Sequence, residues 1–137
     1  MVNALSNQHH PCRSLADLLA LTEHFGHVRG LRAAFVGDAR SNTYTSFLEA
    51  CVAADMHLTI ASPPGYEVAP DVLTSARCAM ANTGGSVSFD PEPYDAVRGA
   101  DAVYAEVCLH CGAVLRFSGA AMVRARRLPR PMGRRGG

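Results

Sequence analysis

The chain has 137 residues, of which 48% are hydrophobic and 18% are charged. This length and composition predict one soluble globular domain with a real core and exclude a fully disordered chain. No apolar run approaches the roughly 18 residues that a membrane span needs. The five cysteines are an odd set, and the first residues contain neither a basic nor an apolar block. We therefore expect no disulfide framework, no secretory signal and a cytoplasmic location.

Charge is distributed unevenly along the chain. Residues 1–112 hold all 12 acidic residues and six of the 13 basic ones, whereas residues 113–137 hold seven arginines and no acid. Arg, Gly and Pro without acids do not pack a core, so we expect residues 113–137 to form a disordered basic tail. The arginines favour nucleic acid, but no aromatic side chain is interleaved among the distal ones, so we expect no nucleic-acid partner.

Helix and strand signals alternate along the first 107 residues. Pro11 suits the first turn of a helix because it lacks an N–H that would have no partner there, and Gly26 is a typical helix stop. Ser41 or Asn42 can cap a second helix. Apolar runs predict strands at 31–36, 57–61, 87–89 and 102–107, and further helices are expected at 71–82 and, after a cap at 90–91, up to residue 97.

This alternation predicts an α/β fold, a Rossmann-like three-layer sandwich of about four parallel strands with helices on both faces. Continuous apolar strands are typical of a parallel sheet that is covered on both sides. A ligand site in such a sheet lies beyond the carboxyl ends of the strands. These ends are expected at residues 37–42, 62–66, 90 and 106–111.

Two polar segments coincide with helix starts in this scheme. His10-Pro11-Cys12-Arg13 opens the first helix, and Gly37-Asp38-Ala39-Arg40-Ser41-Asn42 links the first strand to the second helix. They resemble the His-Pro-x-Gln and Gly-Asp-x-x-Asn-Asn motifs of the carbamoyltransferase family, most closely its ornithine-using members. Further matches at 65–67, 84–85 and 99–104 follow in the same order, so the resemblance covers about residues 2–107.

The resemblance implies roles for individual residues. His10 matches the family's catalytic histidine, which contacts the carbonyl oxygen of carbamoyl phosphate, and Arg13 stands where the family has Gln and would bind the same anion. Asn42 matches the second Asn, which contacts ornithine, while Ser41 replaces the first. Glu106 replaces the Asp of the family's Asp-x-Trp-x-Ser-Met-Gly segment. His110 and Cys111 replace its Ser and Met, and we include them as substrate-binding candidates.

The resemblance also implies an activity, namely transfer of the carbamoyl group from carbamoyl phosphate to the ornithine side-chain amine, giving citrulline in arginine biosynthesis. No cofactor is implied. The family's Ser-Thr-Arg-Thr phosphate loop and His-Cys-Leu-Pro segment are missing from the sequence. Family members are homo-oligomers, but the half that forms the oligomer is missing too. We therefore expect a partial ornithine-binding-like domain at residues 1–112, a tail at 113–137, and no activity of the chain alone.

Alternative interpretations remain open at the sequence level. The abrupt loss of similarity fits a frameshift, a truncation or a decayed gene, and then the chain is a non-catalytic remnant that binds an amino acid or a partner subunit at most. Cys108, His110 and Cys111 suggest a zinc or redox site, but one Cys pair without a second is a weak signal, and we expect no metal. Asn42 can act as a helix cap alone, and Glu106 as a solvated acid.

Overall fold

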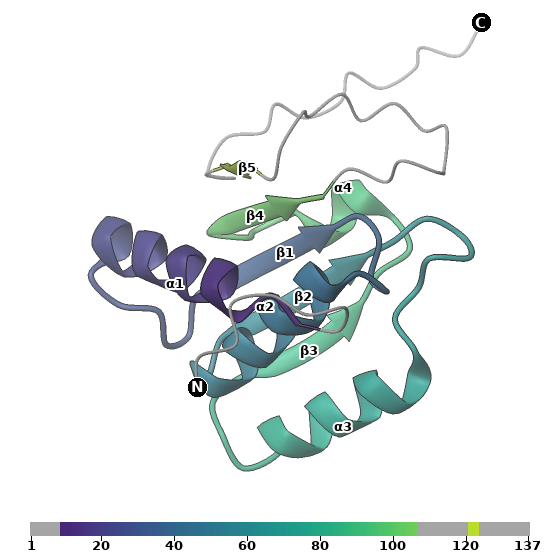
Figure 1. Cartoon of the computed structure of the whole chain (residues 1–137), viewed down its shortest axis with the longest axis horizontal. Helices are drawn as coiled ribbons and strands as arrows, with labels where there is room; N and C mark the ends of the chain where they lie inside the picture. Colours follow the sequence, from purple (N-terminus) through teal and green to yellow (C-terminus); the bar gives the residue numbers. More distant parts are fainter. Residues whose placement is uncertain (1–8, 107–120, 124–137) are drawn as a thin grey trace, which may run out of the picture.

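The structure, a computed structural model, describes residues 9–106 and 121–123. Its sheet has five strands in the order β3-β2-β1-β4-β5, and the first four along the chain are parallel, as predicted (Figure 1). The strands are β1 (Arg32–Val36), β2 (His57–Ala61), β3 (Ser86–Phe89), β4 (Ala102–Ala105) and β5 (Ala121–Val123).

Strand β5 was not expected, because it falls in the segment predicted to be a disordered tail. It pairs antiparallel with β4, with Val103 opposite Val123. The rest of that segment, 113–120 and 124–137, lies outside the described residues. Residues beyond the expected domain boundary therefore contribute at least one strand to the sheet.

Helices cover both faces of the sheet, as predicted, but unequally. Side chains of α1 (Pro11–Phe25), α2 (Asn42–Ala53) and α3 (Pro70–Met80) form the core with one face, and α4 (Pro93–Ala96) packs on the other. Figure 1 shows α2 in front of the sheet and α3 below β3. In the described part of the chain, no helix is long and apolar enough to cross a membrane.

Most element ends agree with local sequence signals. Helix α1 begins at Pro11 and ends at Gly26, whose left-handed φ of 78° lets its N–H donate to the Thr22 carbonyl oxygen at 2.8 Å. The structure selects Ser41 as the cap of α2, since its Oγ accepts the Tyr44 N–H at 3.0 Å. The short helix α4 starts after Glu92, later than the predicted cap at residues 90–91.

The main core joins β1, β4 and α2 through aromatic rings. Phe35 of β1 stacks on Tyr104 of β4 with ring centroids 5.5 Å apart, and Phe47 of α2 lies 4.9 Å from Tyr104. Tyr44, also from α2, meets Phe35 edge-on at 5.0 Å. Such rings bury large apolar areas and favour stacked or edge-to-face geometry. This packing fixes the start of α2 next to the carboxyl ends of β1 and β4.

The second face of the sheet is only partly apolar, unlike the continuous apolar strands expected. Near the carboxyl ends, Val36, Ala61 and Val103 pack against Ala96 of α4. Strands β2 and β3 instead alternate, and at their amino ends they place polar side chains on this face: His57, Thr59, Ser86 and Ser88. Alternation of this kind is typical of a sheet with one covered face and one polar face.

Gly37 allows the chain after β1 to approach the end of β4 closely. Its φ is 149°, and an added Cβ would lie 2.6 Å from the Glu106 carbonyl oxygen. We expect Gly37→Ala to reduce the free energy of unfolding by about 2–3 kcal/mol, because the backbone must shift or strain. Urea unfolding measures this loss. Gly84→Ala is the control, since nothing lies within 4 Å of its added Cβ, and equal losses in the two variants would contradict the prediction.

Candidate functional site

The carboxyl ends of β1 and β4 form the switch point of this sheet. The chain leaves β1 through α2 on one face and enters β4 from α4 on the other. Because the flanking loops diverge at such a point, a ligand crevice is expected between them. The loop after β2 closes one side, because the Ala39 N–H donates to the Tyr66 carbonyl oxygen at 3.1 Å. The Arg40 guanidinium also lies 4.6 Å from the Tyr66 ring centroid. The fold thus gathers the loops that the sequence analysis singled out.

Ser41 and Glu106 meet at the expected crevice, although 65 residues separate them. The Ser41 hydroxyl donates to Glu106 Oε2 at 2.6 Å and accepts the Tyr44 N–H in turn. This chain of two hydrogen bonds ties the start of α2 to the end of β4. Sequence reasoning considered Ser41 only as a cap and as a replaced family residue, and no local pattern indicates its contact with Glu106.

Asn42 and Asp38 lie on the same turn as Ser41. Asn42 is half-buried at the first position of α2, and its Oδ1 accepts the Thr43 hydroxyl at 3.4 Å. Asp38 Oδ1 accepts the Arg40 N–H at 2.9 Å, so Asp38 shapes the turn. The structure therefore places Asn42 one residue from the Ser41–Glu106 contact.

The Glu106 carboxyl group is half-buried. Burial has the largest effect and raises the pKa of Glu106 above its usual value, and nearby Asp38 raises it further. Hydrogen bonds from the Ser41 and Thr43 hydroxyls, and the positive charge of Arg13, lower the pKa but do not cancel this effect. Burial of a carboxylate is costly unless a cation or hydrogen-bond donors accompany it. The site therefore favours a positively charged partner, such as an ammonium group, over a neutral one.

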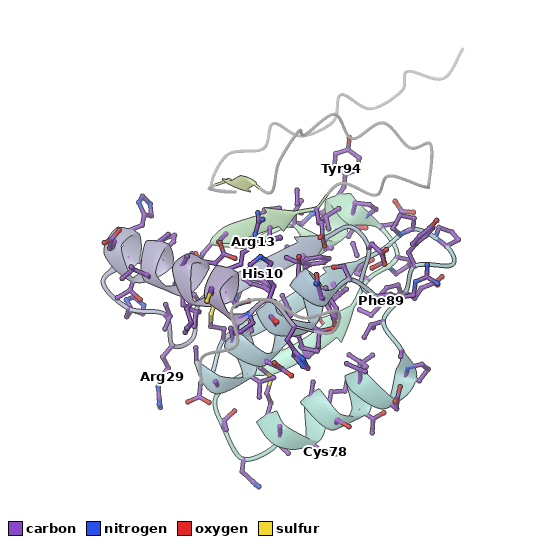
Figure 2. The ribbon with its side chains drawn as sticks, viewed as in Figure 1. His10, Arg13, Arg29, Cys78, Phe89 and Tyr94 are labelled. Atoms are coloured by element: carbon purple, nitrogen blue, oxygen red, sulfur yellow. The ribbon has the colours of Figure 1, made fainter. Side chains whose placement is uncertain are left out.

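His10 and Arg13 lie on the first turn of α1, close to the place where α1 meets α2 (Figure 2). The His10 N–H donates to Ser46 Oγ of α2 at 2.7 Å, while its Nδ1 is buried without a hydrogen bond to the described residues. The Arg13 guanidinium lies 5.8 Å from the ring centroid of Tyr104, two residues before Glu106. Arg13 therefore stands between the His10 turn and the end of β4.

Buried polar groups continue along the same face of α1, and the sequence analysis missed them. Burial raises the pKa of Asp17, against the lowering effect of Arg13 and His10. Burial, and then Asp17, raises the pKa of Tyr104 to about 12. Several buried atoms here have no hydrogen-bond partner among the described residues: Ser14 Oγ, Asp17 Oδ2, Tyr44 Oη and Tyr104 Oη. Ser14 and Asp17 follow His10 at helical spacing, and this spacing was the sequence signal that could have identified them. Buried polar atoms of this kind are often found at functional sites or bind water.

The remaining candidates, His110 and Cys111, lie outside the described residues, as does Cys108. The structure therefore does not place them relative to Glu106. Among residues 9–106, no three His, Cys, Asp or Glu side chains are grouped so that they could hold a metal ion. The zinc interpretation of this segment stays a hypothesis.

Comparison with known proteins supports the resemblance seen in the motifs. Residues 29–123 match the Asp/Orn binding domain of the aspartate/ornithine carbamoyltransferase family. This match reaches beyond the end of the recognisable motifs near residue 107 and includes β5. The ornithine carbamoyltransferase of Clavibacter sepedonicus is 45% identical over 112 residues, which are 82% of this chain and 36% of that protein.

Solved structures agree with the sequence match. The ornithine carbamoyltransferase of Gloeobacter violaceus superimposes with a TM-score of 0.73 at 38% identity, covering 79% of this chain and 38% of that one. A mutant N-acetyl-L-ornithine transcarbamylase gives a TM-score of 0.64 at 31% identity, covering 72% and 32%. The chain thus spans about a third of the length of these relatives.

Removing the charge of Glu106 should stabilise the fold in a pH-dependent way. Folding raises the pKa of Glu106, so its protonated form is the one that stabilises the folded chain. The contribution of Glu106 to the free energy of unfolding is therefore complete below its usual pKa of 4.5 and is lost as the pH rises through its pKa in the folded state. We expect Glu106→Gln to match the parent below pH 4.5 and to be more stable above it. Denaturant unfolding across this range measures the difference, with exposed Glu23→Gln as the control. A difference that does not change with pH would contradict the prediction.

Removing the Ser41 hydroxyl should destabilise the chain at neutral pH. Ser41→Ala removes the cap of α2 and a hydrogen bond to Glu106, for an expected loss of about 1–2 kcal/mol. Ser75→Ala, at an exposed position of α3, should change the free energy of unfolding by less than about 0.5 kcal/mol. Equal unfolding midpoints for the two variants would show that the contact adds nothing.

Proposed function

The chain belongs to the aspartate/ornithine carbamoyltransferase family, and on this premise we propose that it is the ornithine-binding domain of a carbamoyltransferase. In the proposed reaction, the ornithine side-chain amine attacks the carbonyl carbon of carbamoyl phosphate. A tetrahedral oxyanion forms, phosphate leaves, and the product is citrulline. Such a reaction needs alignment of two substrates and hydrogen-bond donors directed at the oxyanion.

The residues divide into two groups in this proposal. Asn42 and Glu106 hold the amino acid at the crevice between β1 and β4. His10 donates to the carbonyl oxygen of carbamoyl phosphate, and Arg13 attracts its phosphate group. The remaining groups that hold carbamoyl phosphate come from outside this chain, which spans about 36% of its relatives. Assembly with further copies or with a complementary chain is part of the same proposal.

The observation that carries the proposal is the Ser41–Glu106 contact. A half-buried carboxylate is held at the start of a helix, at the switch point of a parallel sheet. Ornithine presents an α-ammonium group beside its carboxylate. Glu106 complements the ammonium, and the first turn of α2, which includes Asn42, complements the carboxylate.

Two departures from the family motifs meet each other at this point. Ser41 stands in place of an Asn, and Glu106 stands in place of an Asp and is longer by one methylene group. The longer side chain reaches the shorter one, and the two form a hydrogen bond of 2.6 Å. A compensating pair of this kind favours a retained site over independent loss of the two residues.

The alternative is a non-catalytic remnant that binds an amino acid or a partner subunit at most. Both alternatives place the amino acid in the same crevice, and the remnant differs only in that it does not catalyse the reaction. The division of the chain at residue 112 and the cytoplasmic location stay predictions under both alternatives.

The chain alone should not form citrulline from carbamoyl phosphate and ornithine. Loss of single donors at such sites costs about 2.7–4 kcal/mol of barrier, and here most groups that hold carbamoyl phosphate are absent. A colorimetric citrulline assay on the purified chain tests this, with a full-length ornithine carbamoyltransferase as the positive control. Turnover above background that disappears in His10→Ala would overturn the prediction.

Ornithine should nevertheless bind weakly at the crevice. We expect saturable shifts of the backbone amide NMR signals of residues 37–44, and Asn42→Ala or Glu106→Ala should weaken binding at least about fivefold, equivalent to one lost hydrogen bond. Asn82→Ala, in the exposed turn after α3, is the matched control. N-acetyl-L-ornithine lacks the α-ammonium charge and should bind less tightly than ornithine. Tight zinc binding that is lost in Cys108→Ser, with no response to ornithine, would refute the proposal.

A further inference from the structure

The opposite end of the sheet holds a cavity, which the carbamoyltransferase proposal does not use. Its volume is about 320 Å³. It lies on the face of the sheet that carries α4, at the amino ends of the strands, whereas Glu106 follows the carboxyl end of β4. The polar and glycine residues that line it are Arg32, His57, Thr59, Ser86, Arg98 and Gly99.

Three of these residues form one row across three strands. Arg32 of β1 is in register with His57 of β2, and His57 is in register with Ser86 of β3. Residues that are paired in register on neighbouring strands present their side chains on the same face of the sheet. The His57 Nδ1 and the Ser86 hydroxyl are 2.9 Å apart. This contact fixes the imidazole ring and leaves Nε2 on its far side for another partner.

The charges around the cavity are mostly positive. In the part of the chain that the structure describes, the Arg32 guanidinium forms no ion pair, and its Nη1 lies 3.8 Å from the position of an added Cβ on Gly99. Arg98 pairs with Asp95 at 2.9 Å, but both side chains are largely exposed, so the pair is weak and exchangeable. The Asp101 carboxylate accepts the Arg32 N–H, and neither Asp95 nor Asp101 lines the cavity.

We propose that this cavity binds a small oxyanion of the phosphate class, either free phosphate or a phosphate monoester. Its lining includes two arginines, a histidine and the hydroxyl residues Thr59 and Ser86, and each of these side chains can donate a hydrogen bond to an anionic oxygen. Guanidinium groups match the geometry of phosphate oxygens through paired hydrogen bonds. Gly99 leaves room beside Arg32 for the ligand to approach. The site is separate from the ornithine crevice and does not depend on it.

The full chain titrated with inorganic phosphate tests the proposal, at constant ionic strength set with chloride. Saturable shifts of the amide NMR signals of residues 57, 86 and 99 are expected. Arg32→Ala and Arg98→Ala should each weaken binding about five- to tenfold, as expected for a partly exposed charged hydrogen bond. Since Arg98 is largely exposed, its replacement keeps the test valid if the Arg32 variant does not fold.

Arg29→Ala is the matched control. Figure 2 shows Arg29 pointing away from the sheet, and its guanidinium pairs with Asp55 at 3.0 Å. This variant should bind phosphate like the parent, and so should Asn42→Ala, which tests independence from the ornithine crevice. A second titration with glycerol phosphate identifies the source: tighter binding than phosphate indicates an ester, and equal or weaker binding indicates the free ion. Shifts that do not saturate, or an equal loss of affinity in Arg29→Ala, would overturn the proposal.

Discussion

The stacking of Phe35 on Tyr104 joins two strands that are about seventy residues apart in the sequence and directly opposite each other in register. Everything at the carboxyl edge depends on this contact. It holds β1 beside β4, and Phe47 of α2 packs on the same ring. The turn at Gly37 and the backbone of Glu106 are thereby brought so close that only a glycine hydrogen fits between them. The hydrogen bond from Ser41 to Glu106 depends on this strand pairing, because the two residues are far apart in the sequence and only the pairing of β1 with β4 brings them together.

Local signals in the sequence predicted most of the fold. Helix α1 begins and ends where Pro11 and Gly26 indicate, and β1 and β2 coincide with their apolar runs to within one residue. These elements are set by short-range physics, namely a missing N–H, a left-handed turn and an apolar stretch. The polar second face of β2 and β3 was missed, because the alternation extends over too few residues to stand out from a short apolar run.

The candidate site was only partly predictable, for a different reason. The order β2-β1-β4 decides which strand ends meet, and sequence patterns do not contain that order. Asn42 and Glu106 were expected near the carboxyl edge, and the structure places both there. The role of Ser41 as a bridge depends on a contact across the sheet. The partly buried polar groups of α1, such as Asp17, become apparent only once Tyr104 is placed beside them.

The short strand β5 makes β4 an interior strand of the sheet. With β1 on one side and β5 on the other, β4 is an interior strand, hydrogen-bonded along both of its edges. Glu106 follows directly after it and is itself anchored, since its N–H donates to the Val36 carbonyl oxygen at 2.9 Å. The conformational entropy of this carboxylate is therefore largely lost during folding. A ligand that meets Glu106 does not have to order it again, so more of the contact free energy is available as affinity.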